Sequence, residues 1–561
     1  MRIVLLVSSF HGLTQRVWCA LADAGHDVRV QLAGDPGAVV DSVERINPAL
    51  VLCPFLLDKV PSSVWQRWKT VIVHPGPVTD HGPGSLDRAI THGAERWGVT
   101  ALQKTSDGRV GPIWASRTFD MPAVPLRKTE IYNGPISDAT IDCVWEVVAK
   151  AADPAYRPPG IDRELSGVRA IPAGLDRTVS WDLDADSIVR TIRAADGDPG
   201  VLTEIGGEPF YAYDAHVDGD STEAPGTVIG HHQDAVLISA GRGSIWLGQL
   251  RTVPTSHRPT VKLPAWPLLA ELSGPGLTVA AMGRHGDRRP TFRPIRYQRR
   301  DDVGYLTLDS YNGALSTAHC RRILRALRSA IAQDTRVLVL RGGWSTFSNG
   351  IHLGVIQASA QAATEAWANV VAITAICKEI ITCGRQVTIG TYTGNAGAGG
   401  VMLALGADVV VGRDGVVLNP YYDMGLFGSG LHSYTLPRRV GAGTAERLLT
   451  ERLPVSIGHA AGLGLVDAIG PRSPKAFTSW LAEFAERYAE RGLWREMLAA
   501  KRRILERDAV RMPLEAYQAA ELGEMTRDIF GDRSGFATAR AAFVYKQRNP
   551  AGRPYLTSQV A

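Results

Sequence analysis

The sequence predicts a multi-domain α/β protein: an open, mostly parallel sheet, then a small β-barrel, then a second α/β domain with a helical C-terminus. Three observations predict this class. The chain has 561 residues, more than a single domain usually holds. Short apolar runs alternate with helical patterns over residues 1–120 and again from Arg296. Between these two regions lies a series of closely spaced short strands, which is typical of a small barrel.

The first domain is expected over residues 1–160. The predicted strands are Arg2–Val7, Asp27–Leu32, Leu50–Pro54 and Val71–His74, and the predicted helices are Leu13–Ala24, Ala38–Ile46, Ser85–Gly93 and Asp138–Ala152. This alternation predicts parallel βαβ units in an open sheet. Because ligands of such sheets bind at the carboxyl ends of the strands, the loops Ser8–Arg16 and His74–Ser85 are the expected binding loops.

The second domain is expected over residues 170–255. Its predicted elements are one helix, Asp186–Ala194, and the strands Val201–Leu202, Phe210–Asp214, Thr227–Gly230, Ala235–Ser239 and Ser244–Gln249. Short strands at regular spacing predict a small β-barrel. Residues 256–294 are rich in Pro, Gly and Arg, and we expect them to form a linker.

The third domain is expected over residues 295–561. Its predicted strands are Val303–Leu308, Thr335–Arg341 and Gln386–Gly390, its predicted helices are Ser316–Ala332 and Glu365–Thr382, and the chain from Pro474 onward is helical. Residues Gln386–Ala407 carry no charge, but they are rich in glycine and threonine. They therefore predict a strand, a loop and a helix rather than a membrane span.

Charge and cysteine content exclude several classes of protein. The chain has 61 basic and 56 acidic residues, so its net charge of +5 argues against a dedicated nucleic-acid binder or a polybasic membrane protein. The six cysteines form no CxxC pair and have no metal-spaced histidines nearby. This pattern disfavours a disulfide scaffold and a metal site, and it favours a reducing compartment. Since Ile3–Val7 is too short for a signal sequence, we expect a cytoplasmic protein.

His74-Pro75-Gly76 marks the end of a predicted strand in the first domain. A histidine in this place, beside a loop rich in Gly and Pro, suits general acid–base work or stabilisation of an oxyanion. The same residues also fit a hydrogen-bonded loop histidine whose glycines serve a tight turn. On these residues alone, both interpretations stay open.

Two glycine-containing segments of the third domain indicate a site for a carbonyl or an anion. Phe347–Leu353 follows a strand, and Gly394–Met402 opens a helix. Backbone N–H groups at such places can hold an anion or a developing oxyanion. A dinucleotide GxGxxG fingerprint fails because Met402 stands where its third glycine would be. Each segment alone is as well explained by packing, but together they predict an oxyanion hole.

These motifs resemble known families. Residues 1–120 resemble the formyltransferases that use 10-formyltetrahydrofolate, residues 177–251 resemble their small C-terminal domain, and the region from Arg296 to about Leu481 resembles the crotonase (enoyl-CoA hydratase/isomerase) superfamily. The combination is similar to the HypX/HoxX-type hydrogenase maturation proteins. The matching stretches are Gly12–Arg16, His74–Gly76, Gly82–Asp87, Asn395–Met402, Leu418–Pro420, Leu436–Gly441 and Phe543–Lys546.

The resemblance implies a two-step activity. The first half would pass the formyl group of 10-formyltetrahydrofolate to coenzyme A, and the crotonase-like half would convert formyl-CoA to carbon monoxide for a [NiFe] hydrogenase. The implied partners are these small molecules and hydrogenase maturation proteins, with no nucleic acid and no membrane. Two alternatives stay open: a relative that formylates a small-molecule amine, and a non-catalytic scaffold that binds folate and CoA.

The resemblance also implies site residues. The catalytic set would be His74, Asp107, Ile351, Gly399 and Tyr422, with the N–H groups of Ile351 and Gly399 as the oxyanion donors. The residues expected to contact folate or CoA are Gln15, Arg16, Ser85, Asp87, Asn349, Gly350, Asn395 and Gly397.

The folate half departs from the formyltransferase pattern at two positions. Ile72 stands where these enzymes usually have an asparagine two residues before the histidine. Their catalytic aspartate aligns with Arg109, and the nearest carboxylate is Asp107. Asp107 is therefore expected to assist His74 only if the loop shifts to present it.

The crotonase-like half departs from the hydratase pattern as well. The two hydratase glutamates fall on Met402 and Tyr422, so hydration of an enoyl-CoA is not expected. Tyr422 matches a tyrosine of the maturation family. The glutamate that accompanies that tyrosine aligns with Gly430, which leaves this position without a carboxylate.

Overall fold

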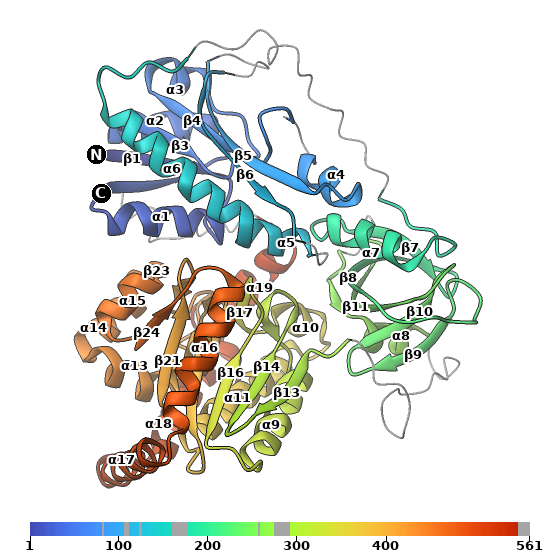
Figure 1. The fold of residues 1–561 in the computed structure, drawn as a ribbon, viewed down its shortest axis with the longest axis vertical. Helices are drawn as coiled ribbons and strands as arrows, with labels where there is room; N and C mark the ends of the chain where they lie inside the picture. The colour runs from blue at the N-terminus through green and yellow to red at the C-terminus, as the bar shows by residue number, and fades with distance from the viewer. Residues whose placement is uncertain are drawn as a thin grey trace. The chain divides into compact units, whose positions relative to one another are not determined.

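The computed structural model describes residues 1–80, 84–105, 111–122, 126–159, 177–255, 259–273 and 292–547. Figure 1 shows the fold, coloured from blue at the N-terminus to red at the C-terminus. The chain divides into two compact units, one containing Met1–Phe292 and the other Arg293–Tyr555. The multi-domain α/β class predicted from the sequence is confirmed.

The first unit begins with a six-stranded sheet of order β2-β1-β3-β4-β5-β6. Its strands are β1 (Arg2–Val7), β2 (Asp27–Leu32), β3 (Leu50–Cys53), β4 (Thr70–His74), β5 (Arg96–Gln103) and β6 (Ile113–Asp120). The first four strands are parallel, and β5 and β6 continue the sheet in antiparallel fashion. The predicted, mostly parallel sheet is therefore confirmed. Strands β1 and β3 are apolar and buried on both faces, as central strands of parallel sheets are.

Helices cover both faces of this sheet. They are α1 (Leu13–Asp23), α2 (Pro36–Ile46), α3 (Ser62–Arg67), α4 (Ser85–Thr91), α5 (Lys128–Ile131) and α6 (Ser137–Ala152), with a π-helical turn η1 (Tyr132–Ile136) between the last two. The carboxyl ends of β1, β3 and β4 lie at one edge of the sheet, because these strands are parallel. The loops that follow them meet there: the N–H of Ser8 donates to the carbonyl of Phe55 over 3.1 Å.

The second part of the first unit is an antiparallel sheet of order β7-β8-β11-β10-β9, with β12 paired to β11. Its elements are α7 (Ala185–Ala194), β7 (Val201–Ile205), β8 (Glu208–Val217), β9 (Val228–His232), β10 (Ala235–Ser239), β11 (Ser244–Thr252), β12 (Leu263–Pro264) and α8 (Ala265–Ser273). Among the described residues β7 and β9 do not pair, so the sheet is open, and the prediction of a closed barrel is wrong. Residues of α7 and α8, including Ile188 and Leu269, bury the apolar face of the sheet, and closure is not needed for that.

The region expected to be a linker, residues 256–294, is partly structured. Its described residues include β12 and α8. Leu268 and Leu269 of α8 pack into the core of the second sheet. Pro267, which the sequence-based expectation took as a mark of irregular chain, lies in the first turn of α8, where its missing N–H has no intrahelical acceptor to lose.

The second unit contains a six-stranded sheet of order β13-β14-β16-β19-β21-β24, a four-stranded sheet of order β17-β20-β22-β23 and the short pair β15-β18. The strands are β13 (Ile295–Arg300), β14 (Val303–Leu308), β15 (Ala314–Leu315), β16 (Val337–Arg341), β17 (Thr346–Ser348), β18 (Gly350–Ile351), β19 (Val387–Tyr392), β20 (Asn395–Gly397), β21 (Val409–Arg413), β22 (Val417–Asn419), β23 (Val455–Ser456) and β24 (Ala468–Gly470). A 3-10 turn, η4 (Tyr311–Gly313), precedes β15.

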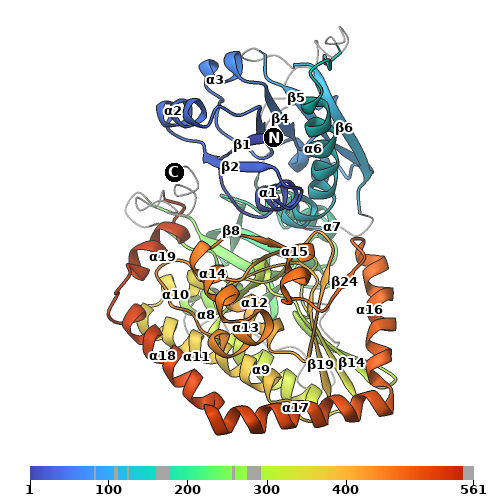
Figure 2. The ribbon, with the colours of Figure 1, turned by 90° about the vertical axis from the view of Figure 1, so that its left-hand side faces the viewer.

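Helices enclose these sheets. They are α9 (Thr317–Ile331), α10 (Leu353–Ala358), α11 (Ala362–Ile381), α12 (Gly399–Leu405), α13 (His432–Val440), α14 (Ala442–Glu451), α15 (Ile457–Leu463), α16 (Pro474–Ala489), α17 (Arg491–Arg511), α18 (Leu514–Ile529) and α19 (Phe536–Val544). Figure 2 shows the last four following one another around the second unit. Alternate residues of β16 face opposite cores: Leu338 packs with α9 and α11, and Val339 packs with α16. The predicted helical C-terminus is confirmed.

The uncharged segment Gln386–Ala407 forms β19, β20 and α12, which is the predicted order of strand, loop and helix. In the described parts of the chain, no helix has both the length and the hydropathy that crossing a membrane requires.

Candidate functional site

His74 is the last residue of β4, at the edge of the first sheet where the parallel strands end. Its Nε2 lies 2.9 Å from the carbonyl oxygen of Asp80. A carbonyl oxygen can only accept, so Nε2 carries a proton and donates it. The loop after His74 folds back on the ring: a Cβ at Gly76 would lie 2.6 Å from Nε2. The structure thus shows a loop histidine that hydrogen-bonds to its own loop at the predicted edge, and the acid–base or oxyanion role stays a prediction.

Gln15 and Arg16 lie near the start of α1, which follows the carboxyl end of β1. Both side chains are buried. The guanidinium of Arg16 pairs with Asp138 of α6, and the amide of Gln15 donates to the carbonyl of Phe10 over 3.4 Å. The structure therefore places these two residues at the same edge as His74, but the charge of Arg16 is already paired with that of Asp138.

Ser85 and Asp87 lie in the first turn of α4 and are buried. Asp87 pairs with Lys128 of α5 and, over 3.1 Å, with Arg177, which leads into the second sheet. The negative charge of Asp87, together with burial, raises the pKa of Tyr132. Asp87 thus links the first sheet to the chain that enters the second sheet through Arg177, and it holds α5 through Lys128. Sequence reasoning missed Lys128 and Arg177, because this contact spans elements far apart in the chain.

Asp107 and Arg109, which decide whether the folate half keeps a carboxylate partner for His74, lie outside the described residues.

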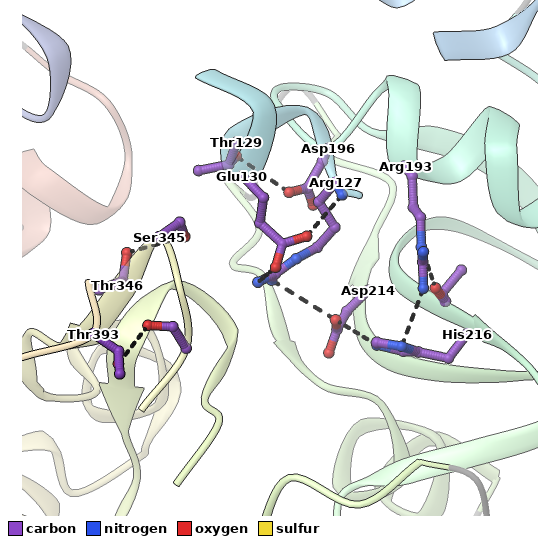
Figure 3. A network of polar contacts seen from close by, with 12 residues as sticks. Arg127, Thr129, Glu130, Arg193, Asp196, Asp214, His216, Ser345, Thr346 and Thr393 are labelled. Atoms are coloured by element: carbon purple, nitrogen blue, oxygen red, sulfur yellow. Dashed lines mark hydrogen bonds and ion pairs between the residues drawn. The ribbon is translucent and has the colours of Figure 1, made fainter. Parts of the chain in front are cut away.

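A second polar network joins α5, α7 and β8 within the first unit (Figure 3). Arg127 lies 3.8 Å from Asp214, and Nε2 of His216 lies 3.0 Å from the same carboxylate. Nη2 of Arg193 lies 3.2 Å from Nδ1 of His216. Since a guanidinium only donates, Nδ1 accepts and Nε2 carries the proton toward Asp214. Thr129 adds a link to the same region through Asp196, at 3.3 Å.

In the second unit the two glycine-containing segments lie side by side. Gly350 has φ +82°, a conformation that favours glycine, and a Cβ there would lie 3.4 Å from the backbone nitrogen of Gly399. Ile351 follows Gly350, and Gly399 is the first residue of α12, so its N–H has no acceptor in a preceding helical turn. The structure thus brings the two predicted oxyanion segments together.

The approach of these segments depends on Gly400. A Cβ at Gly400 would lie 2.1 Å from the carbonyl oxygen of Ser348, closer than two such atoms can come. The residue before the helix, Ala398, has φ +49°, which is unusual for a residue with a side chain. Strained backbone of this kind is typical of functional sites.

Asparagine side chains and Thr393 fix the surroundings of the two segments. Asn349 donates from Nδ2 to the carbonyl of Asn312 over 2.9 Å, and its Oδ1 would be 3.2 Å from a Cβ at Gly397. Asn395 accepts from the N–H of Val417 over 2.9 Å. The expected CoA contacts therefore lie around the oxyanion segments, where both asparagines also hydrogen-bond to the backbone.

Thr393 fixes the turn after β16. Its hydroxyl donates to the carbonyl of Gly343 over 3.0 Å and accepts from the N–H of Gly342 over 3.2 Å. Figure 3 includes this threonine together with Ser345 and Thr346, which directly precede the first of the two segments. Through Thr393, the chain that precedes β20 is tied to the chain that precedes β17.

Tyr422 lies in the loop between β22 and α13 and packs in the core that contains Met402. Its hydroxyl donates to the carbonyl of Ser429. Burial, with the charges of Glu521 and Cys377, raises the pKa of Tyr422 well above its ordinary value of 10.0. Tyr422 is therefore a proton donor and not a base at neutral pH.

Gly430, the position that lacks the expected carboxylate, has little room for one. Its φ is +81°, and a Cβ there would lie 3.3 Å from Cβ of Met402 and 3.4 Å from Sγ of Cys377. The structure brings another carboxylate near this loop: Glu521 of α18 accepts the N–H of Leu431 over 2.9 Å. Sequence reasoning missed Glu521, because nothing in the pattern of α18 distinguishes it from a surface glutamate.

Comparisons with known proteins agree with this geometry. The family model "Formyl transferase, C-terminal domain" matches residues 175–255, and the model "Enoyl-CoA hydratase/isomerase" matches residues 298–547. The hydrogenase maturation factor HoxX of Bradyrhizobium diazoefficiens is 36% identical over 554 residues, which cover 97% of this chain and 95% of that protein.

Two further proteins extend the comparison. A methionyl-tRNA formyltransferase of Chromobacterium violaceum is 38% identical over 172 residues, which cover 30% of this chain and 54% of that protein. The crystal structure of HypX from Aquifex aeolicus in complex with tetrahydrofolic acid superposes with a TM-score of 0.91 and 32% identity, and the match covers 100% of this chain and 98% of that one.

Proposed function

The chain belongs to the HypX/HoxX family of hydrogenase maturation factors, and we propose that it moves the formyl group of 10-formyltetrahydrofolate to coenzyme A and then releases carbon monoxide from formyl-CoA. The observation that carries the proposal is the presence of two kinds of site in one chain. A histidine ends a strand at the edge of a formyltransferase-type sheet where such sheets bind ligands, and two backbone segments suited to an oxyanion hole approach each other in a crotonase-type unit.

In the folate half, His74 stabilises the charge that develops on the formyl oxygen during transfer. Formyl transfer passes through a tetrahedral intermediate, and a fixed N–H donor lowers its free energy. The Nε2–H of His74 supplies this donor when the formyl oxygen replaces the carbonyl of Asp80 as its acceptor. The related HypX of Aquifex aeolicus crystallised with tetrahydrofolic acid, which supports a folate ligand for this chain. We assign the second role to Asp107, as the nearest carboxylate in the loop.

The buried polar side chains at this edge fit a folate ligand. Gln15 and Arg16 lie near the start of α1, Ser85 and Asp87 lie in the first turn of α4, and together the four supply both donors and acceptors. A pterin ring offers both kinds of partner, so a mixed set suits it better than a purely basic one.

In the crotonase-like half, the N–H groups of Ile351 and Gly399 polarise the thioester carbonyl. Neither Gly350 nor Gly399 has a side chain, so the backbone stays open to a close approach by a carbonyl oxygen. Asn349 and Asn395 hold the surrounding backbone, and Gly397 lies beside the side chain of Asn349. The same donors stabilise an oxyanion whatever bond of the thioester breaks next.

A specific observation favours an alternative product. Gly430 lacks the carboxylate expected beside Tyr422, so a relative that formylates an amine instead of releasing carbon monoxide is the second candidate. The two candidates share the folate half and differ in the acceptor and the final product.

The first experiment follows the formyl group at its first acceptor. The full-length protein is incubated with 10-formyltetrahydrofolate and either CoA or a panel of primary amines, and formylated products are identified by mass spectrometry. The proposal predicts formyl-CoA and a rate that depends on CoA. Formylated amines without formyl-CoA would favour the alternative, and ligand binding without any transfer would favour a scaffold.

A further inference from the structure

A group of buried, ionisable side chains lies beside Tyr422 in the second unit. His432 is the first residue of α13, and Glu521 lies on α18. The exposed fractions of Tyr422, His432 and Glu521 are 8%, 3% and 1%. The titratable groups that bear on this group are Glu521 from α18, Cys377 from α11 and Tyr422 itself. Burial of an ionisable side chain is costly unless it has a hydrogen-bond or ion-pair partner, so we asked which partners these three side chains have.

His432 and Glu521 form a pair. Nδ1 of His432 lies 3.2 Å from Oε1 of Glu521, although it makes no directional hydrogen bond in the described structure. Burial by itself raises the pKa of Glu521, but contacts with His432 and Ser433 outweigh this effect, and the pKa is lowered. The carboxylate is therefore ionised at neutral pH. An ionised carboxylate beside Nδ1 favours a proton on that nitrogen and leaves Nε2 as the acceptor.

Capping of α13 explains why the carboxylate of Glu521 is buried in this place, but it does not explain why the imidazole of His432 is buried there. The carboxylate accepts the N–H of Leu431 over 2.9 Å and the N–H of Ser433 over 2.8 Å, and these groups lie at the start of the helix. A cap needs only an acceptor in this place. An imidazole that is almost fully buried, with one nitrogen toward the capping carboxylate, is not required for it.

The loop before His432 packs against α12, the helix that Gly399 opens. Gly430, two residues before His432, packs against Met402: a Cβ at Gly430 would lie 3.3 Å from Cβ of Met402. Met402 follows Gly399 by three residues, which is about 4.5 Å along the axis of α12. The rings of Tyr422 and His432 have centroids 5.1 Å apart.

We propose that His432 is the proton carrier of the crotonase-like half and that Glu521 is its positioning residue; this inference rests on the proposed breakdown of formyl-CoA. Nε2 of His432 takes the proton of the formyl C–H bond. The electron pair of that bond stays on carbon and becomes the lone pair of carbon monoxide, while the C–S bond breaks and its pair goes to sulfur. The imidazolium then returns the proton to the thiolate, so formyl-CoA gives carbon monoxide and CoA.

An imidazole suits this role better than the neighbouring phenol. The hydroxyl of Tyr422 is already donated to Ser429, and the phenol remains protonated at neutral pH. Histidine ordinarily titrates near neutral pH and can therefore both accept and return a proton within one turnover.

The test uses the full-length protein supplied with formyl-CoA, so that the folate half is bypassed. The variants are His432→Asn and Glu521→Gln, and the matched control is Glu515→Gln on the same helix, whose carboxylate is exposed and pairs with Lys378 over 2.9 Å. We expect His432→Asn to lower kcat for carbon monoxide release about 10²-fold with little change in KM. Glu521→Gln should lower kcat and move the acid limb of the pH profile, and Glu515→Gln should do neither.

A second assay separates this inference from the proposed function. Acetyl-CoA in D2O reports proton transfer to and from a bound thioester, because its methyl group gains deuterium without any release of carbon monoxide. If the wild type exchanges but forms no carbon monoxide, the proposed function fails, and loss of exchange in His432→Asn still supports the proton carrier. Glu521→Gln, which keeps an acceptor for the helix start, is the second variant if His432→Asn does not fold. A folded His432→Asn protein that equals the wild type in both assays, or a wild type inactive in both, overturns the inference.

Discussion

At the scale of single residues, His74 is fixed in both position and protonation. Its Nε2 donates to the carbonyl of Asp80, and the loop that supplies this carbonyl approaches the ring so closely that Gly76 has no room for a side chain. The N–H stabilises an oxyanion once the formyl oxygen takes the place of the Asp80 carbonyl as its acceptor.

His74→Ala should lower folate-dependent formyl transfer about 10²-fold or more, because the donor to the developing oxyanion is lost. The measurement is the rate of formyl-CoA formation from 10-formyltetrahydrofolate and CoA. His92→Ala, at the exposed end of α4, is the control and should keep the wild-type rate. A folded His74→Ala protein with a normal rate would remove His74 from the mechanism.

Individual site residues could be predicted unevenly from the sequence. The positions of His74, Gly350 and Gly399 were predictable, because each follows or opens an element that its local pattern defines. The contacts of Asp87 with Arg177 and of His432 with Glu521 could not be predicted, because they join elements far apart in the chain. A local pattern carries no information on which distant side chain will face a buried group.

At the scale of elements, strands and long helices followed the sequence closely. Strands β1, β2, β10 and β14 have the predicted bounds, because their apolar runs end at clear turn residues. The sequence analysis did not predict helix α8. Pro267 interrupts its helical sequence pattern, and the helix becomes apparent only from its packing against the second sheet. Barrel closure was overpredicted, because strand spacing does not reveal that two helices cover the sheet.

A substitution at the start of α12 tests whether the two glycine-containing segments form an oxyanion hole. Gly400→Ala should abolish turnover of a CoA thioester, because the new Cβ would collide with the carbonyl of Ser348 and push the two oxyanion segments apart. Gly443→Ala is the matched control: it lies inside α14 with open space around it, so it should leave the rate unchanged and stabilise the helix by about 0.5–1 kcal/mol. Equal rates for the two variants would contradict the assignment of these segments.

The network around Asp214 predicts how the first unit responds to acid. Burial raises the pKa of Asp214, but His216, Arg127 and Arg193 together lower it below the ordinary 3.8. The ionised carboxylate therefore stabilises the folded state. This stabilisation is complete above the ordinary value and is lost as the pH falls through the lower folded value.

Asp214→Asn should destabilise the first unit by about 3–5 kcal/mol at neutral pH, since it leaves buried cations without their partner. The φ of +55° at this position suits asparagine as well as aspartate, so the backbone is preserved. The measurement is the free energy of unfolding in urea at neutral pH and near pH 3. From neutral pH to pH 3, this free energy should fall less in the variant than in the wild type. Asp120→Asn, at an exposed pair with Arg96, is the control and should behave as the wild type. If the free energy of unfolding depended on pH in the same way for Asp214→Asn and the wild type, the ionised carboxylate of Asp214 would not be the source of this stabilisation.

At the scale of the whole molecule, regions related to two different enzyme families occur in one chain. The order of the domains and their relation to two families could be predicted, because each unit has several local motifs along its length. The absence of a hydratase carboxylate at Met402 was also visible in the sequence, and for this reason we expect no hydration of an enoyl-CoA. The source of the proton carrier was not visible, because it is assembled from α13 and α18.

The central claim, transfer of one formyl group through both units, is tested most directly with 10-formyltetrahydrofolate labelled with ¹³C in its formyl group. The full-length protein is incubated with this donor and CoA, and ¹³C-labelled formyl-CoA, formate and carbon monoxide are measured together. The account predicts labelled carbon monoxide that requires CoA and accumulates after labelled formyl-CoA, with CoA regenerated. Labelled formate alone, or labelled carbon monoxide formed equally well without CoA, would contradict it.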